Sequence, residues 1–503
     1  MSLRPQISDA PAFSPPDWFD AAVDTDGDVP RLRVHVGGEW QRLDDTFPVH
    51  SPIDGSLLAH AGKATPDEVK GAVAAAADAR AAFHGLAAAE RIAILERAGE
   101  LLKERSGALV DAITIDLGKA REGAASEVGA ACERLSMVRE EVRRISGEFL
   151  PGDWIPDTVG KRAIVMREPV GIVAAIGPFN YPLFLSASKI IPALAAGNTV
   201  VAKAPSDDPI ALLLFARVLE EAGLPPGALN VITGSGREIG DTLAGHEEIS
   251  MVSFTGSSGI GRHITEIAGP KRLHLELGGN AAAVVAADAD LDLAAAKTAK
   301  GAYKSAGQRC DAVSRVFVDR SVADEYLDRL LAEAKGWVLG DPREEGVQVG
   351  PLVNEGAAET VAGFIADATD KGARLALGGE RDGAYVEPTV LADVPLEAEI
   401  LWEEHFGPVL PVVAVDSLDE ALELANRSRY GLDSAVFTTD LDRAWKAASA
   451  LHVGMITVND APAHGVGHFP FGGRTPDSGI GREGLGYSID ECTELKTVVL
   501  PSP

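Results

Sequence analysis

The stretch Val170-Gly-Ile-Val-Ala-Ala-Ile176 decides the fold class of this chain of 503 residues. It is apolar throughout, as is typical of a parallel strand that is covered on both faces of its sheet. Further strand-like runs follow at 199–203, 228–233 and 251–255, and a helical run at 209–222 lies between two of them. Strands and helices that alternate at this spacing predict a βαβ parallel sheet, so we expect an α/β protein.

Outward from this strand, the sequence predicts helices before the sheet and a second α/β unit after it. Residues 66–146 form Ala-, Leu-, Glu- and Arg-rich stretches with helical spacing. After Asn280 the expected strands are 281–286, 314–318, 412–415 and 434–437, and the expected helices are 322–335, 359–371, 418–428 and 441–451. The alternating segment 493–500 predicts a last strand, whereas residues 1 to about 29 are expected to be a loosely ordered extension.

Composition limits the class of protein. The chain is 46% hydrophobic, and none of its apolar runs approaches the roughly 18 residues that cross a bilayer, so no membrane partner is expected. The net charge of −29 argues against nucleic-acid binding, which needs clustered Lys and Arg, and fits either a high-salt cytoplasm or codon bias. Three cysteines without a CxxC or Cys/His cluster predict neither a disulfide framework nor a metal site, and favour a cytoplasmic location.

Two segments carry side chains suited to covalent chemistry. Cys310 ends the segment Ser305-Ala-Gly-Gln-Arg-Cys310, and Glu276 begins the segment Glu276-Leu-Gly-Gly279. A thiol can add to an aldehyde, and a carboxylate can activate the water that later releases the product. Arg309 beside the thiol predicts a lowered cysteine pKa. The alternatives are a buried, inert cysteine and a solvated glutamate.

Four further motifs could build a ligand site, and the first three follow predicted strands, where open α/β sheets bind ligands. In Pro178-Phe-Asn-Tyr-Pro182, the amide of Asn180 could stabilise an oxyanion. Lys203-Ala-Pro-Ser206 offers a lysine to ribose or phosphate, and its serine leaves room for a 2′-phosphate. Phe254-Thr-Gly-Ser-Ser-Gly-Ile-Gly261 can present backbone N–H groups to a diphosphate, and Glu403-Glu-His-Phe-Gly-Pro408 offers a carboxylate to ribose hydroxyls. Each motif alone is equally compatible with a turn or a solvated charge.

Together the motifs resemble those of the aldehyde dehydrogenase superfamily, from about residue 35 to residue 500. The matching segments, in order, are 178–180, 203 onward, 254–257, 276–279, 307–310, 404–408, 469–473 and 478–481. The resemblance implies an N-terminal extension (1–34), a Rossmann-type NAD(P)-binding domain (35–150 and 171–279), a second α/β catalytic domain (280–484) and a β-hairpin oligomerisation arm (151–170 and 485–503). Such an arm implies a homodimer or a homotetramer.

The resemblance also implies roles for individual residues. Cys310 is the nucleophile, Glu276 is the general base, and Lys189 supports the region around Asn180. Asn180 and the backbone N–H of Cys310 form the oxyanion hole. The implied cofactor residues are Ile176, Pro178, Phe179, Lys203, Ser206, Gly236, Gly256, Ser257, Leu277, Gly278, Glu404 and Phe406, and the implied substrate residues are Tyr181, Arg309 and His464. The implied reaction oxidises an aldehyde to a carboxylic acid through a thiohemiacetal and a thioester.

Within the superfamily, segments 167–182 and 203–206 are most similar to the non-phosphorylating glyceraldehyde-3-phosphate dehydrogenases, and the second of them to the NADP-preferring pattern. NADP is therefore favoured over NAD. Two phosphate-contacting positions of that branch match, but Ala130 and His464 stand where the branch carries arginine. Charge-assisted hydrogen bonds are worth about 1.5–3 kcal/mol each, so a small hydroxylated or singly anionic aldehyde fits at least as well as glyceraldehyde-3-phosphate.

Three alternatives make different demands on the sequence. A coenzyme A-acylating semialdehyde dehydrogenase is argued against by Glu276, since that branch looks different at this position. A non-catalytic binding module on the same fold would be expected to have lost Cys310 or Glu276. A redox-sensing thiol protein would need a resolving cysteine near Cys310, whereas Cys132 and Cys492 are distant in sequence.

Overall fold

An eight-stranded sheet forms the centre of the larger part of the molecule, in a computed structural model that describes residues 3–5, 7, 9–463 and 467–501. Its strands are β3 (Val34–Val36), β4 (Glu39–Gln41), β9 (Ile172–Ile176), β10 (Thr199–Lys203), β11 (Leu229–Ile232), β12 (Met251–Thr255), β13 (Arg272–Glu276) and β23 (Gly479–Ile480). The strand order is β23-β13-β12-β9-β10-β11-β3-β4, and β9 to β13 run parallel. The parallel strands thus follow the 3-2-1-4-5 order of a Rossmann-type sheet.

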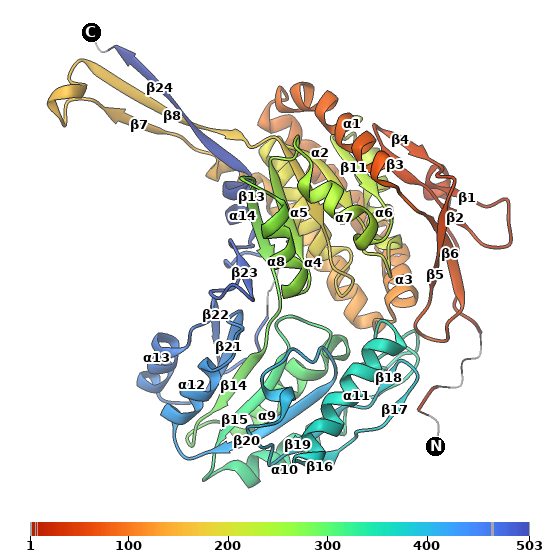
Figure 1. The fold of residues 1–503 in the computed structure, drawn as a ribbon, viewed down its shortest axis with the longest axis vertical. Coiled ribbons are helices and arrows are strands. Elements are labelled where there is room, and N and C mark those ends of the chain that lie inside the picture. Colours follow the sequence, from red (N-terminus) through yellow and green to blue (C-terminus); the bar gives the residue numbers. More distant parts are fainter. Residues whose placement is uncertain (1–2, 6, 8, 464–466, 502–503) are drawn as a thin grey trace.

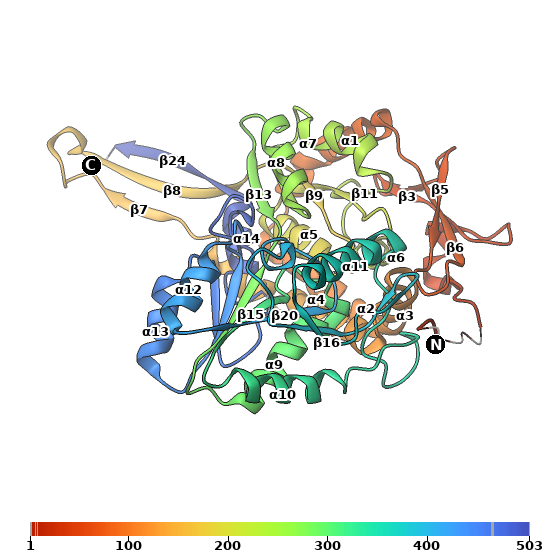
Figure 2. The ribbon, with the colours of Figure 1, turned by 60° about the horizontal axis from the view of Figure 1, so that its bottom comes forward.

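Helices cover both faces of this sheet, as the apolar strand at 170–176 predicted (Figures 1 and 2). They are α1 (Pro66–His84), α2 (Ala88–Glu104), α3 (Ser106–Leu117), α4 (Arg121–Glu141), α5 (Phe184–Ala196), α6 (Ile210–Glu221), α7 (Gly236–Gly245) and α8 (Ser258–Ile267). Val173 and Ala175 of β9 enter the core that α2 to α6 share, whereas Ile172 and Ala174 enter the core of α1, α7 and α8. This alternation follows from the two-residue period of a strand.

A second α/β unit contains a seven-stranded sheet, in the order β16-β19-β20-β15-β14-β21-β22. These strands are β14 (Ala281–Val285), β15 (Val313–Asp319), β16 (Arg374–Leu377), β19 (Thr389–Ala392), β20 (Val409–Val415), β21 (Asp433–Phe437) and β22 (Met455–Val458). Its main helices are α9 (Leu291–Tyr303), α10 (Ala323–Ala334), α11 (Glu355–Asp370), α12 (Leu418–Asn426) and α13 (Leu441–Ala450). The predicted elements of this unit are confirmed, apart from shifts of a few residues at their ends.

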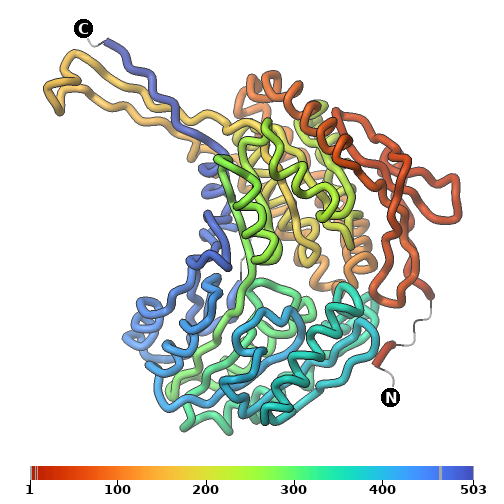
Figure 3. Tube along the Cα trace, viewed as in Figure 1, coloured from red at the N-terminus to blue at the C-terminus, as the bar shows by residue number. Residues whose placement is uncertain are grey.

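The N-terminal segment is folded against the body, so the prediction of a loosely ordered extension is wrong for much of it. A short 3-10 helix spans Asp17–Ala22, and strands β1 (Val23–Asp24), β2 (Arg31–Leu32), β5 (Thr46–His50) and β6 (Leu57–Gly62) form a four-stranded sheet. Phe19 is fully buried and packs edge-on against Trp40. Arg4 forms ion pairs with Glu355 and Asp382 of the second unit, beside which the N-terminal trace runs in Figure 3.

A three-stranded antiparallel sheet projects from the body (Figure 1). It consists of β7 (Glu148–Pro151), β8 (Lys161–Pro169) and β24 (Thr493–Pro501), with β8 in the middle. β24 pairs with β8 over nine residues. Phe149, Trp154 and Leu495 are 61%, 72% and 64% exposed, so the projecting sheet leaves apolar surface in contact with water. Among the helices of the described residues, none is long and apolar enough to cross a bilayer.

Candidate active site

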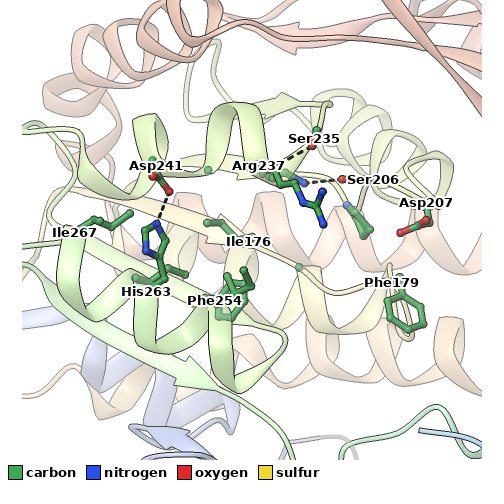
Figure 4. A pocket seen from close by; sticks show the side chains of 17 residues that line it. Ile176, Phe179, Ser206, Asp207, Ser235, Arg237, Asp241, Phe254, His263 and Ile267 are labelled. Carbon is green, nitrogen blue, oxygen red and sulfur yellow. Dashed lines mark hydrogen bonds and ion pairs between the residues drawn. The ribbon is translucent and has the colours of Figure 1, made fainter. Parts of the chain in front are cut away.

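A cavity of about 610 Å³, here called the sheet-end cavity, lies where the parallel strands of the larger sheet end. Its wall includes the ends of β9, β10 and β12 and one side each of α7 and α8 (Figure 4). Five predicted cofactor residues border it: Ile176, Phe179, Lys203, Ser206 and Gly236. This is the switch point of a doubly wound sheet, where such folds bind dinucleotides.

One part of the sheet-end cavity is polar and carries cations. The Lys203 ammonium group donates to the carbonyl oxygen of Ala204 at 2.9 Å and to Ser206 Oγ at 3.3 Å. Burial lowers the pKa of Lys203 to about 8. Arg237, in the first turn of α7, borders the same region, and Figure 4 shows its guanidinium group on the side of Ser206. Arg237 was not predicted from the sequence, because an arginine at an exposed helix start looks like a solvated charge.

The rest of the wall of the sheet-end cavity is mostly apolar and includes Ile176, Phe254, Ile260, Ile264 and Ile267. An apolar slot beside the N-terminus of a helix and a polar end, with Lys203, Arg237 and the carboxyl group of Asp207, suits a flat base joined to phosphates and ribose. These features fit an NAD(P) molecule, with Lys203, Ser206 and Arg237 near its phosphate or ribose groups.

The other predicted cofactor residues lie near the sheet-end cavity without bordering it. Ser257 caps α8 through Oγ, which accepts from the backbone N–H of Ile260 at 3.4 Å. The N–H of Gly256 donates to the carbonyl oxygen of Glu276 at 3.1 Å and is therefore already engaged. Pro178 is adjacent in sequence to Phe179, which borders this cavity. Leu277 is adjacent to Glu276, which borders a second cavity described below.

Glu404 and Phe406 connect the 276–279 segment with the β9 loop. Glu404 accepts from the N–H of Gly279 at 2.9 Å, and burial raises the pKa of this carboxyl to about 7. Gly278 lies so close to Glu404 that a Cβ there would stand 2.9 Å from Oε2. Phe406 packs edge-on against Phe179, with ring centres 5.8 Å apart, and so reaches a residue of the sheet-end cavity.

A second cavity of about 360 Å³, here called the thiol cavity, lies between the two α/β units. Cys310, Glu276, Asn180, Tyr181 and Arg309 all border it. They come from three separate parts of the chain, namely the segment after α9, the end of β13, and the loop between β9 and α5, and residues of α4 form a further wall. The structure therefore brings the thiol, the carboxylate and the amide predicted from separate motifs to one space.

The electrostatic setting of Cys310 differs from the expected one. Burial raises the pKa of this thiol well above its ordinary value, and the carboxylates of Asp311, Asp433, Glu404 and Glu276 add to the effect. The predicted lowering of this pKa is wrong, because burial and the carboxylates outweigh the attraction of the thiolate to Arg309. Its guanidinium group is buried and donates to Asp311 at 2.9 Å and to the carbonyl oxygen of Pro462 at 3.1 Å. These two bonds hold Arg309 in its own loop, and its role towards a substrate stays a prediction.

Two N–H groups at the thiol cavity have a hydrogen available for a ligand. Asn180 Nδ2 donates one hydrogen to the carbonyl oxygen of Gln308 at 2.8 Å, which leaves its second amide hydrogen available. Within the described ranges, the backbone N–H of Cys310 has no hydrogen-bond partner. Together they form a pair of donors of the kind that stabilises an oxyanion.

A buried ion pair holds the Asn180 loop. Lys119 at the end of α3 donates to the carbonyl oxygen of Asn180 at 2.7 Å and pairs with Glu127 of α4. Glu127 in turn accepts from the N–H groups of Leu183 and Phe184 at 3.0 and 3.1 Å. The resemblance implied that Lys189 supports this region, and the structure corrects this: Lys119 does so. Neither Lys119 nor Glu127 carries a signal in the sequence, because both lie more than fifty positions before Asn180.

Lys189 instead lies on the Glu276 side of the thiol cavity. Its ammonium group donates to Thr255 Oγ1 at 2.6 Å and lies 3.5 Å from Glu483 Oε1. Glu276 is buried, and neither of its carboxylate oxygens accepts a hydrogen bond from a described residue. Burial, followed by the nearby Glu483 carboxylate, raises the pKa of Glu276 well above its ordinary value, and Lys189 opposes the shift. A carboxylate of this kind keeps capacity to take a proton from water.

The backbone before Cys310 is strained. Ser305 and Ala306 adopt φ angles of 55° and 54°, a left-handed region in which non-glycine residues cost about 1–3 kcal/mol each. Gly307 continues the run at φ 72°, and a Cβ there would lie 2.1 Å from the carbonyl oxygen of Gly407. Packing against the 404–408 segment thus fixes the loop that presents the thiol.

Two further predictions concern the site. His464 lies outside the described residues, so its role stays a prediction. In the part of the chain that is described, no group of three or more His, Cys, Asp and Glu side chains is arranged to hold a metal ion.

Comparison with known proteins places this geometry in a family. The model of the aldehyde dehydrogenase family matches residues 40–498. The chain is 39% identical over 470 residues to the NADP-dependent glyceraldehyde-3-phosphate dehydrogenase of Streptococcus equinus, covering 93% of this chain and 98% of that protein. It is 38% identical over 472 residues to the 3-sulfolactaldehyde dehydrogenase of Priestia aryabhattai, covering 94% and 98%.

Solved structures agree with these sequence matches. The crystal structure of NADP-dependent glyceraldehyde-3-phosphate dehydrogenase from Bacillus halodurans C-125, complexed with NADP, superposes with a TM-score of 0.92. The two sequences are 36% identical, and the match covers 94% of this chain and 99% of that one. The chain belongs to the aldehyde dehydrogenase family.

Proposed function

We propose that this protein oxidises a small aldehyde to the carboxylic acid with NADP, or less favourably NAD, and that Cys310, Asn180 and Glu276 carry the reaction. The observation that supports this most is the thiol cavity itself. A thiol, two N–H donors and a carboxylate border one space, and a second cavity that suits a dinucleotide lies at the neighbouring strand ends.

The first half of the reaction uses the thiol and the two donors. The Cys310 thiol releases its proton to water in the thiol cavity as its sulfur bonds to the aldehyde carbon, and the carbonyl oxygen becomes an oxyanion. Asn180 Nδ2 and the N–H of Cys310 donate to that oxygen, an arrangement whose single donors are typically worth about 10²–10³ in rate. A cofactor bound in the sheet-end cavity would supply the acceptor for the hydride that leaves the same carbon, and Cys310 would then carry a thioester.

The second half uses Glu276. Its carboxylate takes a proton from a water molecule while the water oxygen bonds to the thioester carbon. The C–S bond then breaks, the acid leaves, and the sulfur of Cys310 returns to its starting state. The buried surroundings of Glu276 raise its pKa, which makes it a stronger base than an exposed glutamate once it is ionised.

The test is the wild-type chain with a panel of small aldehydes and both cofactors, followed by the near-ultraviolet absorbance of the reduced nicotinamide. We expect NADPH to appear at a rate that depends on the aldehyde, together with one equivalent of carboxylic acid. A chain that reduces neither cofactor with any aldehyde of the panel contradicts the proposal.

Cofactor choice provides a prediction for the polar end of the sheet-end cavity. Ser206→Glu places a carboxylate beside Lys203 and Arg237, where it would repel a 2′-phosphate and could bind a free 2′-hydroxyl. We expect the ratio of kcat/KM for NADP to that for NAD to fall by at least about tenfold, since a charge-assisted contact is worth about 1.5–3 kcal/mol. The matched control is Ser146→Glu, at an exposed serine that does not border the cavity, and an unaltered ratio in Ser206→Glu would assign the 2′-position elsewhere.

We also propose a separate role for each unit of the fold. The larger sheet with α1 to α8 binds the cofactor, and the second α/β unit presents Cys310. The β7–β8–β24 sheet makes contact with a second copy of the chain, giving a homodimer or a homotetramer. Its exposed Phe149, Trp154 and Leu495 support this assignment, because single-chain proteins seldom leave apolar side chains together on a projecting element.

A further inference from the structure

We infer that Lys304 binds a singly charged anionic group at the far end of the aldehyde, so that small aldehydes carrying a carboxylate or a sulfonate are the preferred substrates. This inference rests on the proposed aldehyde oxidation and deepens it. Lys304 borders the thiol cavity six positions before Cys310, and its side chain is only partly exposed.

Lys304 is one of three cations in the region of the thiol cavity that includes Tyr181. The Lys119 ammonium group lies over the ring of Tyr181, 3.6 Å from its centre. The hydroxyl group of Tyr181 lies 3.3 Å from Oγ of Ser305, the residue that follows Lys304. Arg309 borders the same cavity from the same loop. Lys304 and Arg309 thus border the cavity directly, and Lys119 contacts it through Tyr181.

Two of these three cations already have an anion. Lys119 is paired with Glu127, and Arg309 Nε lies 2.9 Å from Asp311 Oδ1. On the Glu276 side of the thiol cavity, Lys189 is paired with Glu483. Of the residues that the structure describes, none provides a carboxylate within ion-pair distance of Lys304. Among these three cations, Lys304 is therefore the one whose charge is available to a ligand.

The number of unpaired positive charges also indicates the kind of anion that fits the cavity. One ammonium group neutralises one negative charge, whereas a phosphate dianion would leave a second charge in a partly dry cavity, at a cost in desolvation. Glu133 also borders the cavity, but it is exposed on α4, where water and salt screen its field. A space of about 360 Å³ suits a substrate of a few carbon atoms with one charged end.

The experiment compares two four-carbon aldehydes of matched length, succinate semialdehyde and butanal, in the full-length wild-type protein and in Lys304→Met. In the wild type, we expect kcat/KM for succinate semialdehyde to exceed that for butanal by at least about tenfold, in line with one charge-assisted contact. In Lys304→Met, the ratio of the two values should fall by at least about tenfold, with most of the change in KM for succinate semialdehyde. Added NaCl should lower the wild-type ratio and leave the variant's ratio unchanged.

Two further variants separate a specific contact from a general effect of charge. Lys304→Arg should retain most of the preference, and Lys300→Met, which removes an exposed lysine of α9 outside the cavity, should retain all of it. The inference is overturned if Lys304→Met changes both aldehydes by the same factor or changes neither, or if the wild type prefers butanal. If the proposed oxidation itself is wrong, the result is different, because then neither aldehyde yields NADPH with any of these proteins.

Discussion

Cys310→Ala is expected to reduce aldehyde-dependent NADPH formation by at least about 10³-fold, because the alanine side chain cannot form the covalent bond on which the proposed reaction depends. Rapid-mixing or steady-state absorbance measurements with an aldehyde accepted by the wild type would show the loss. Cofactor binding, followed by calorimetry, should stay close to that of the wild type, since Cys310 borders the thiol cavity and not the sheet-end cavity.

The matched control for this variant is Cys132→Ala. Cys132 lies in α4 at similar partial exposure and does not border either cavity, so its removal should leave turnover within about twofold. Turnover of Cys310→Ala near the wild-type rate would remove the thiol from the mechanism and with it the proposed thioester.

Glu276→Gln is expected to stop the reaction after the thioester has formed. The amide has nearly the same shape as the carboxylate but cannot take a proton from water, so kcat should fall by about 10²–10⁴-fold. Stopped-flow absorbance should show a burst of about one NADPH per subunit followed by a slow phase, and intact-mass spectrometry should find the acyl group on Cys310. Glu266→Gln, an exposed glutamate of α8, is the control and should show no burst of this kind.

The pH dependence of the same step follows from the position of Glu276. The base has to be ionised, and its pKa is raised above the ordinary glutamate value by burial and by Glu483. Hydrolysis of the thioester in the wild type should therefore increase with pH over a range well above that of an exposed glutamate, and Glu276→Gln should lack this increase. A wild-type profile identical to that of the variant would exclude Glu276 as the base.

Local sequence patterns predicted much of the fold. The strands β9, β10, β12 and β14 are short apolar runs buried on both faces, and such runs are visible in the sequence without knowledge of their neighbours. β13 was less visible, because Arg272-Leu-His-Leu-Glu276 alternates polar and apolar residues at the border of the active site. The N-terminal segment was misjudged because Phe13 and Phe19 stand among Pro and Asp residues, and only their distant partners bury them.

The candidate site was predictable where its residues lie in continuous motifs. Cys310, Glu276 and Asn180 each carry a recognisable neighbourhood, and the structure places all three around one cavity. Supporting contacts were not predictable, because they depend on three-dimensional pairing: Lys119 instead of Lys189 holds the Asn180 loop. The sign of the shift in the Cys310 pKa was also missed, since it arises mainly from burial and partly from the carboxylates of Asp433, Glu404 and Glu276, which are distant from Cys310 in sequence.

The pairing of β24 with β8 has a consequence for biosynthesis. Thr493 of β24 lies opposite Pro169 of β8, which the ribosome makes 324 residues earlier (493 − 169). During translation β8 thus exposes one unpaired strand edge while both α/β units are being made, and an exposed edge of this kind invites pairing with other nascent chains. Completion of the projecting sheet is consequently a late event in the maturation of this chain.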